Sequence, residues 1–116
     1  MGSQTPPLNE WIKIGEVGVD AGLMMIGDPC YSNGDEPANS LIGDWDKFCD
    51  YVQKEENQIH HNVACGIPFV MGHDGAAVVT STGFGDGVYD VFAKFIDEKD
   101  WGIRIKEVKV VFIADE

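Results

Sequence analysis

Residues 80–91 read Thr-Ser-Thr-Gly-Phe-Gly-Asp-Gly-Val-Tyr-Asp-Val, and this stretch decides how the chain folds. Gly83, Gly85 and Gly87 alternate here with an aromatic ring and a carboxylate. Glycine adopts backbone conformations that other residues rarely adopt, and it lets a partner approach the main chain closely. The stretch is therefore either a tight turn, such as a hairpin with a bulge, or a loop whose amides hold a ligand.

Strand-like patterns lie on both sides of this glycine segment. Apolar residues alternate over residues 11–19, with a bulge expected near Gly15, and a short buried run follows at residues 23–26. Further strands are predicted at residues 76–82, 88–96 and 103–113, the last with a phase change near Glu107. Residues 63–71 contain Pro68, so they form either two short strands or one edge strand. Short connections between successive strands favour antiparallel pairing.

One helix is predicted near residues 44–56. Asp44 suits the N-cap position, and Trp45, Phe48, Cys49 and Val52 recur at helical spacing, so these side chains are expected to face the core. The predicted fold is mostly β (α+β): an antiparallel sheet, curled or sandwiched, with this one main α-helix packed against it.

Length and composition favour one globular domain, residues 1–116, with residues 1–9 as an extended tail. The chain has 116 residues, 44% of them hydrophobic, and a formal net charge of −12. That charge argues against binding to nucleic acid polymers or to anionic membranes. Three cysteines without a CxxC pair suggest reduced thiols, and no apolar run is long enough to span a membrane, so we expect a cytoplasmic protein.

A second cluster, Gly-Asp-Pro-Cys-Tyr at residues 27–31, follows the short apolar strand. The Asp28 carboxylate either binds a ligand or caps the amides of the following loop. Cys30 is expected to be a buried, inert thiol, because no His or Lys close in sequence would activate it as a nucleophile.

These two clusters resemble an uncharacterised family of small bacterial and phage proteins that is classed as a domain of unknown function. The resemblance rests on residues 19–22, on Gly-Asp-Pro-Cys-Tyr at 27–31, and on Ser-Thr-Gly-Phe-Gly-Asp-Gly-Val-Tyr at 81–89. Asp90 stands where the family pattern has proline. The resemblance implies a shared fold and a shared pocket in which the two clusters meet, but no established reaction.

The predicted ligand-binding residues come from both clusters: Asp28, Tyr31, Gly83, Phe84, Gly85, Asp86 and Tyr89. Phe84 lies between glycines, so it is expected to be exposed and to contact a ligand or a second subunit of a homo-oligomer. A metal site is only weakly indicated. Asp28, His73 and Asp86 offer suitable donors, but the sequence has no HxxxH or HxH spacing. No cofactor can be identified from the sequence.

Three functions remain open at this point, and with them the question of whether the protein is an enzyme. The first is a binding protein for a small polar or phosphorylated ligand. The resemblance extends this hypothesis to sequestering a nucleotide immune messenger in phage–host conflict. The second is a metal-assisted hydrolase of such a molecule. The third is an acidic protein–protein interaction module.

Overall fold

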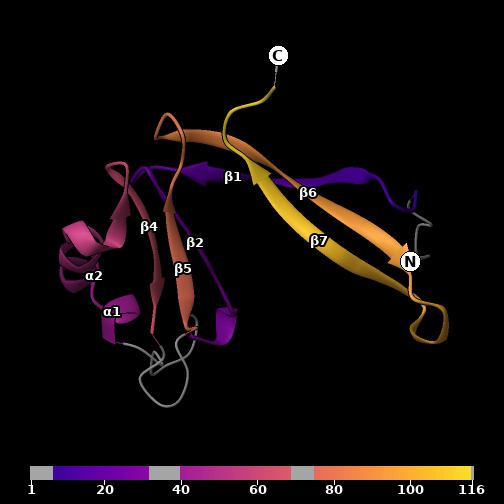
Figure 1. The fold of residues 1–116 in the computed structure, drawn as a ribbon, viewed down its shortest axis with the longest axis horizontal. Helices are drawn as coiled ribbons and strands as arrows, with labels where there is room; N and C mark the ends of the chain where they lie inside the picture. The colour runs from indigo at the N-terminus through magenta and orange to yellow at the C-terminus, as the bar shows by residue number, and fades with distance from the viewer. Residues whose placement is uncertain (1–6, 32–39, 69–74, 116) are drawn as a thin grey trace. The chain divides into compact units, whose positions relative to one another are not determined.

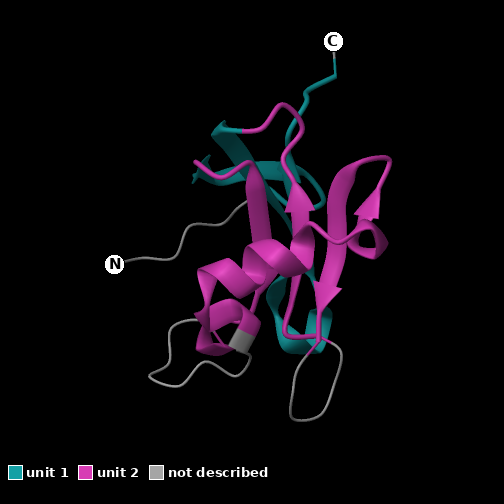
Figure 2. Ribbon diagram, turned by 90° about the vertical axis from the view of Figure 1, so that its left-hand side faces the viewer, with its two compact units in different colours: residues 1–19, 86–116 teal, residues 20–85 magenta. Residues whose placement is uncertain are grey.

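The computed structural model describes residues 7–31, 40–68 and 75–115. The chain divides into two compact units, which Figure 2 shows in different colours. Unit 1 comprises Met1–Val19 and Asp86–Glu116, and unit 2 comprises Asp20–Gly85. Both contain an antiparallel sheet, so the predicted mostly β fold class is confirmed. The single domain stays a prediction.

Unit 1 is a three-stranded antiparallel sheet in the order β1-β6-β7 (Figure 1). Its strands are β1 (Trp11–Val19), β6 (Gly87–Asp97) and β7 (Ile103–Val111), and the short 3-10 helix η3 (Lys99–Trp101) lies between the last two. The register shifts between Lys13 and Gly15, where a bulge is predicted. It shifts again between Lys94 and Phe95, opposite the predicted phase change near Glu107.

Strand register gives the unit 1 sheet two chemically different faces. One row across the three strands is Lys13, Phe92 and Lys109, and the next row is Trp11, Lys94 and Glu107. Because alternate residues of a strand point to opposite faces, these two rows share a face that mixes charges with aromatic rings. The intervening row of Ile12, Ala93 and Val108 belongs to the other, apolar face.

Unit 2 contains a four-stranded antiparallel sheet in the order β2-β5-β4-β3. Its strands are β2 (Leu23–Gly27), β5 (Ala77–Ser81), β4 (Asn62–Ile67) and β3 (Gln58–Ile59). Its helices are α1 (Ser40–Gly43) and α2 (Trp45–Val52), with short 3-10 turns η1 (Pro29–Tyr31) and η2 (Glu55–Asn57).

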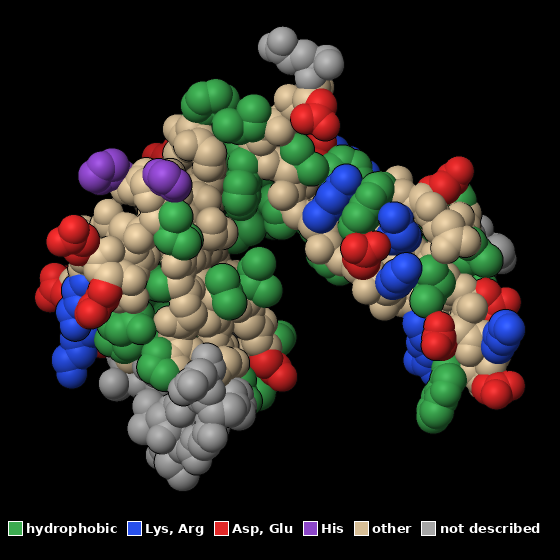
Figure 3. Space-filling view, viewed as in Figure 1, with side chains coloured by type: hydrophobic (Ala, Val, Ile, Leu, Met, Phe, Trp, Pro, Cys, Tyr) green, Lys and Arg blue, Asp and Glu red, His purple; other side chains and the backbone are tan. Residues whose placement is uncertain are grey.

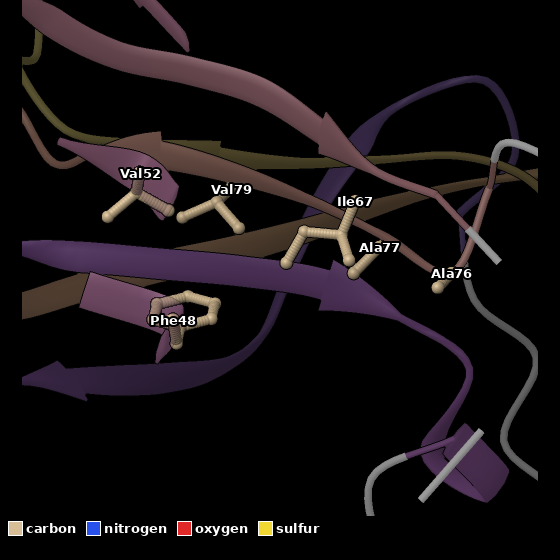
Figure 4. Close-up of a cluster of buried hydrophobic side chains, with 6 residues drawn as sticks. All are labelled: Phe48, Val52, Ile67, Ala76, Ala77 and Val79. Carbon is tan, nitrogen blue, oxygen red and sulfur yellow. The ribbon is translucent and has the colours of Figure 1, made fainter. Parts of the chain in front are cut away.

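The core of unit 2 lies between α2 and one face of this sheet. Phe48 and Val52 of α2, one helical turn apart, pack against Ile67 of β4 and Val79 of β5 (Figure 4). Ile67 and Val79 have no solvent exposure. Burying four such side chains stabilises the fold by roughly 1.5–3 kcal/mol each.

Helix α2 begins as predicted, but its end and its first apolar residue differ from the prediction. Asp44 is the N-cap, and its carboxylate accepts a hydrogen bond of 3.2 Å from the Lys47 amide. The helix ends at Val52 rather than near residue 56. Trp45 is 60% exposed, which corrects the expectation that it faces the core. It is the first helical residue, and its ring stacks on the outer side of Phe48 with centroids 5.6 Å apart.

Gly27, the last residue of β2, allows a close approach of two strands. A Cβ atom built at this position would lie 2.8 Å from the Ala76 carbonyl oxygen, which is too close for any real contact. We predict that Gly27→Ala lowers the free energy of unfolding by about 1–3 kcal/mol in urea denaturation, because the backbone must shift. Gly18→Ala is the control, since a Cβ there meets nothing within 4 Å. Equal stability of the two variants would contradict this packing.

His60 and His61 form the two-residue turn between β3 and β4, and both have positive φ angles, 50° and 65°. Such a turn favours Asn-Gly, because residues with a Cβ are strained in the left-handed region. We predict that replacing the pair by Asn-Gly raises the free energy of unfolding by about 1 kcal/mol. Ala-Ala at the same positions serves as the control and should not stabilise. The same denaturation measurement checks both variants.

Candidate functional site

The glycine segment connects two sheets and is not a hairpin. Strand β5, which precedes it, pairs with β2 and β4, whereas β6, which follows it, pairs with β1 and β7. The hairpin interpretation is therefore wrong. A local turn begins the segment: the Gly85 amide donates to the Thr82 carbonyl at 3.1 Å, and the Thr82 hydroxyl donates to the Gly85 carbonyl at 2.6 Å.

This turn requires glycine and leaves one large side chain in solvent. Gly83 and Gly85 have φ angles of 63° and 103°, which disfavour any other residue. Phe84 between them is 85% exposed, so the expectation that it is exposed is confirmed. Asp86 is also exposed and is the first residue of the second part of unit 1.

Asp28 acts as a cap for the turn that follows β2. Its carboxylate accepts a hydrogen bond of 2.9 Å from the Cys30 amide, and its carbonyl accepts one of 3.0 Å from the Tyr31 amide. Hydrogen bonds from the Cys30 amide and thiol hold the pKa of Asp28 below its usual value. The hydrogen bond to Asp28 in turn raises the pKa of the Cys30 thiol. Cys30 is exposed, not buried as predicted, but its raised pKa disfavours the nucleophilic thiolate.

The two predicted halves of the site do not meet within unit 2. Gly27 pairs with Ala77 and Leu23 pairs with Ser81, so β2 and β5 run antiparallel. Asp28 therefore lies beyond one end of this pair, and Gly83–Gly85 lie beyond the other. The paired residues alone span roughly 13 Å at the usual rise of a strand. The expected pocket shared by Asp28 and this turn is wrong.

The remaining predicted residues fall in different places. Tyr31 is half-buried and packs against the core of unit 2. Tyr89 is on β6, half-buried, with its ring perpendicular to that of Phe112 at 5.3 Å between centroids. His73 lies outside the described residues. Within residues 7–31, 40–68 and 75–115, no three His, Cys, Asp or Glu side chains are grouped to hold a metal ion.

Tyr89 also borders a groove of about 460 Å³ that is formed entirely by unit 1. This aromatic groove lies along β1, β6, β7 and the residues after β7. Its volume falls within the usual range for small-molecule sites. It is lined by Trp11, Val88, Tyr89, Asp90, Phe92, Lys109, Val111, Phe112, Ala114 and Asp115.

Two ammonium groups lie over the ring of the groove residue Trp11, and of these two lysines only Lys109 lines the groove itself. The Lys109 Nζ lies 4.3 Å from the ring centre, and the Lys94 Nζ lies 4.7 Å from it. Lys109 is also 5.8 Å from the centre of the Phe92 ring. An aromatic face attracts a cation through its quadrupole, by about 0.5–1 kcal/mol at exposed sites. The rings thus fix the position of two positive charges.

The two lysines differ in their ionic partners. The Lys94 Nζ lies 3.7 Å from a carboxylate oxygen of Glu107. In the described part of the chain, Lys109 has no carboxylate partner. The groove residue Asp90 is instead paired with Lys13 at 3.1 Å, and this hydrogen bond raises the pKa of Lys13. Lys109 is therefore a cation that rests on aromatic rings, and no described carboxylate forms an ion pair with it. Figure 3 shows the mixture of basic, acidic and apolar side chains on the strands of unit 1.

Most of this groove was not identifiable from the sequence. Only Tyr89 was predicted as a site residue, whereas Lys109 and Phe92 were not. They lie 17 residues apart and become neighbours through the pairing of β6 with β7. Alternation of lysine with apolar residues in residues 103–111 marks a solvated strand face, but it does not identify the neighbouring strand.

Comparison with protein-family models, curated proteins and solved structures finds no match to this chain. The resemblance noted in the sequence therefore stays a prediction, as does the function it implies. Among the described residues, no helix has the length and apolar character needed to cross a membrane.

The contact between Asp28 and Cys30 predicts a change in thiol reactivity. Asp28→Asn replaces the carboxylate that raises the pKa of the Cys30 thiol, mainly through a hydrogen bond and to a smaller extent through its charge. The thiolate fraction at pH 8 should then increase, and alkylation of Cys30 by iodoacetamide should become several-fold faster. Mass spectrometry of the Cys30 peptide measures this rate. Cys49 and Cys65 in the same protein serve as internal controls, and an unchanged Cys30 rate would contradict the assignment.

Proposed function

We propose that this chain is a binding protein for a small, planar, negatively charged molecule, and that the aromatic groove of unit 1 is its binding site. The observation that carries the proposal is the Lys109 ammonium, which rests on Trp11 and Phe92 without a carboxylate partner among the described residues. A ligand anion would supply that partner.

The groove favours an anion near its lining residue Lys109, which shares the Trp11 ring with Lys94. Their two like charges lie over one ring, and only Lys94 has a carboxylate neighbour, so a phosphate or carboxylate beside them is stabilised. Asp115 also lines the groove and repels an anion. The charged end of the ligand therefore lies toward Lys109 and away from Asp115.

The aromatic side chains suit the planar part of such a ligand. Four aromatic side chains line the groove: Trp11 from β1, Tyr89 and Phe92 from β6, and Phe112 from the segment after β7. A heterocycle packing against them gains apolar burial together with stacking. A nucleotide combines a planar base with a phosphate. The nucleotide immune messengers of phage–host conflict belong to this chemical class, and a cytoplasmic protein would meet them.

Titration calorimetry with a panel of nucleoside monophosphates and cyclic nucleotides tests the proposal. Lys109→Met removes the charge but keeps most of the side chain, so it should weaken binding about tenfold, which corresponds to about 1.4 kcal/mol. The matched control is Lys106→Met on the same strand, outside the groove, which should change affinity less than about threefold. Asp115→Asn removes the repelling carboxylate and should strengthen binding.

Two outcomes would reject this assignment. One is the absence of binding heat for every nucleotide at millimolar concentration. The other is an equal loss of affinity in the Lys109 and Lys106 variants, because general electrostatic attraction would then suffice. Circular dichroism of each variant establishes that its fold is retained.

A further inference from the structure

Strand β2 differs from the other edge strands that the structure describes. An exposed edge presents unpaired amides and carbonyls to other chains, so proteins protect edges with charges, bulges or short length. Strand β1 carries Lys13 and a bulge, and β7 carries Arg104 and Lys106. Strand β3 is only two residues long. Strand β2, Leu-Met-Met-Ile-Gly, has no charge, no proline and an unbroken register with β5.

An apolar groove lies beside this unprotected edge. It has a volume of about 220 Å³ and belongs entirely to unit 2. Ala21, three residues of β2 and Val79 of β5 supply one side, and α1 and α2 supply the other. The lining residues are Ala21, Leu23, Met24, Met25, Ile42, Trp45, Phe48 and Val79. Met25 is 39% exposed and Trp45 is 60% exposed, so large apolar surfaces face solvent at the rim.

Most charged residues next to the groove lining in the sequence are acidic, with Lys47 beside Phe48 as the exception. Asp20 and Asp28 lie just before and just after β2, and Asp44 and Asp46 flank Trp45 in the sequence. Residues 20–85 contain ten Asp and Glu but only two Lys and no Arg. Carboxylates at both ends of an apolar edge complement a segment with an apolar centre and cationic ends.

These observations point to a peptide-binding site, and we infer that β2 accepts an extended basic segment of a partner protein as an additional strand. The added strand makes main-chain hydrogen bonds with β2 and places one apolar side chain between Met25 and Trp45. Its lysines or arginines lie toward Asp20 and Asp28. Groove recognition between an edge strand and a helix combines main-chain affinity with side-chain specificity. The site shares no lining residue with the aromatic groove of unit 1.

A synthetic peptide provides the probe: acetyl-Lys-Arg-Val-Thr-Leu-Thr-Val-Lys-Arg-amide. Fluorescence anisotropy of a labelled copy should show saturable binding, and hydrogen exchange should slow at alternate β2 amides. Met25→Lys places a cation at the edge and in the groove, and should weaken binding at least tenfold. Val78→Lys is the matched control, because it adds the same charge at a different place. Val78 is 51% exposed and lies on the inner strand β5, outside the groove. This variant should change affinity less than about threefold.

Trp45→Ala tests the groove independently, because this exposed side chain lies outside the buried core cluster. It should also weaken the peptide about tenfold while circular dichroism stays unchanged. Replacing the central leucine of the peptide by proline should abolish binding, since proline cannot pair as a strand. Three results would overturn the inference. One is binding that does not saturate at millimolar peptide, and another is equal binding of the proline peptide. The third is an equal loss of peptide affinity in Met25→Lys and Val78→Lys. Self-association that Met25→Lys removes would assign the edge to a second copy instead.

Discussion

The register of two strand pairs determines the form of the glycine segment. Strands β1 and β6 pair up to Val19 and Gly87, and β2 and β5 pair from Leu23 and Ser81. Three residues, 20–22, therefore connect β1 to β2, and five residues, 82–86, connect β5 to β6. The five-residue connection contains the turn from Thr82 to Gly85, whose two hydrogen bonds fold the chain back locally.

Much of the glycine motif therefore has a structural explanation. Gly85 is required by its positive φ angle, and Thr82 is almost completely buried with its hydroxyl bonded to the Gly85 carbonyl. A buried hydroxyl without such a partner would destabilise the fold by roughly 1–3 kcal/mol. The turn does not explain Phe84, since a polar residue at this position would be equally compatible with the backbone and better solvated. A motif rich in glycine can thus reflect the geometry of a connection more than the chemistry of a ligand.

Local patterns predicted the longer strands and helix α2 but not the short elements α1 and β3, and long-range pairing explains why the site was missed. The bulge near Gly15 and the N-cap at Asp44 depend on a few adjacent residues, and both are present. The hairpin at the glycine segment and the pocket around Asp28 required knowledge of which strands pair. Trp45 shows a second limit. Its spacing from Phe48 and Val52 is helical, but the side chain of this first helical residue is 60% exposed and stacks on Phe48.

The net charge of −12 does not describe the electrostatic field at each site, and the local field decides which ligands can bind there. Six of the eight basic residues belong to unit 1, and Lys13, Lys94 and Lys109 share one face of its sheet. Electrostatic interactions between exposed charges decay over about 8 Å at physiological salt, so distant carboxylates contribute little at Lys109. The acidic excess is concentrated in residues 20–85. An anion at the aromatic groove and a basic segment at β2 are therefore compatible, because each site is governed by the charges within a few ångströms of it.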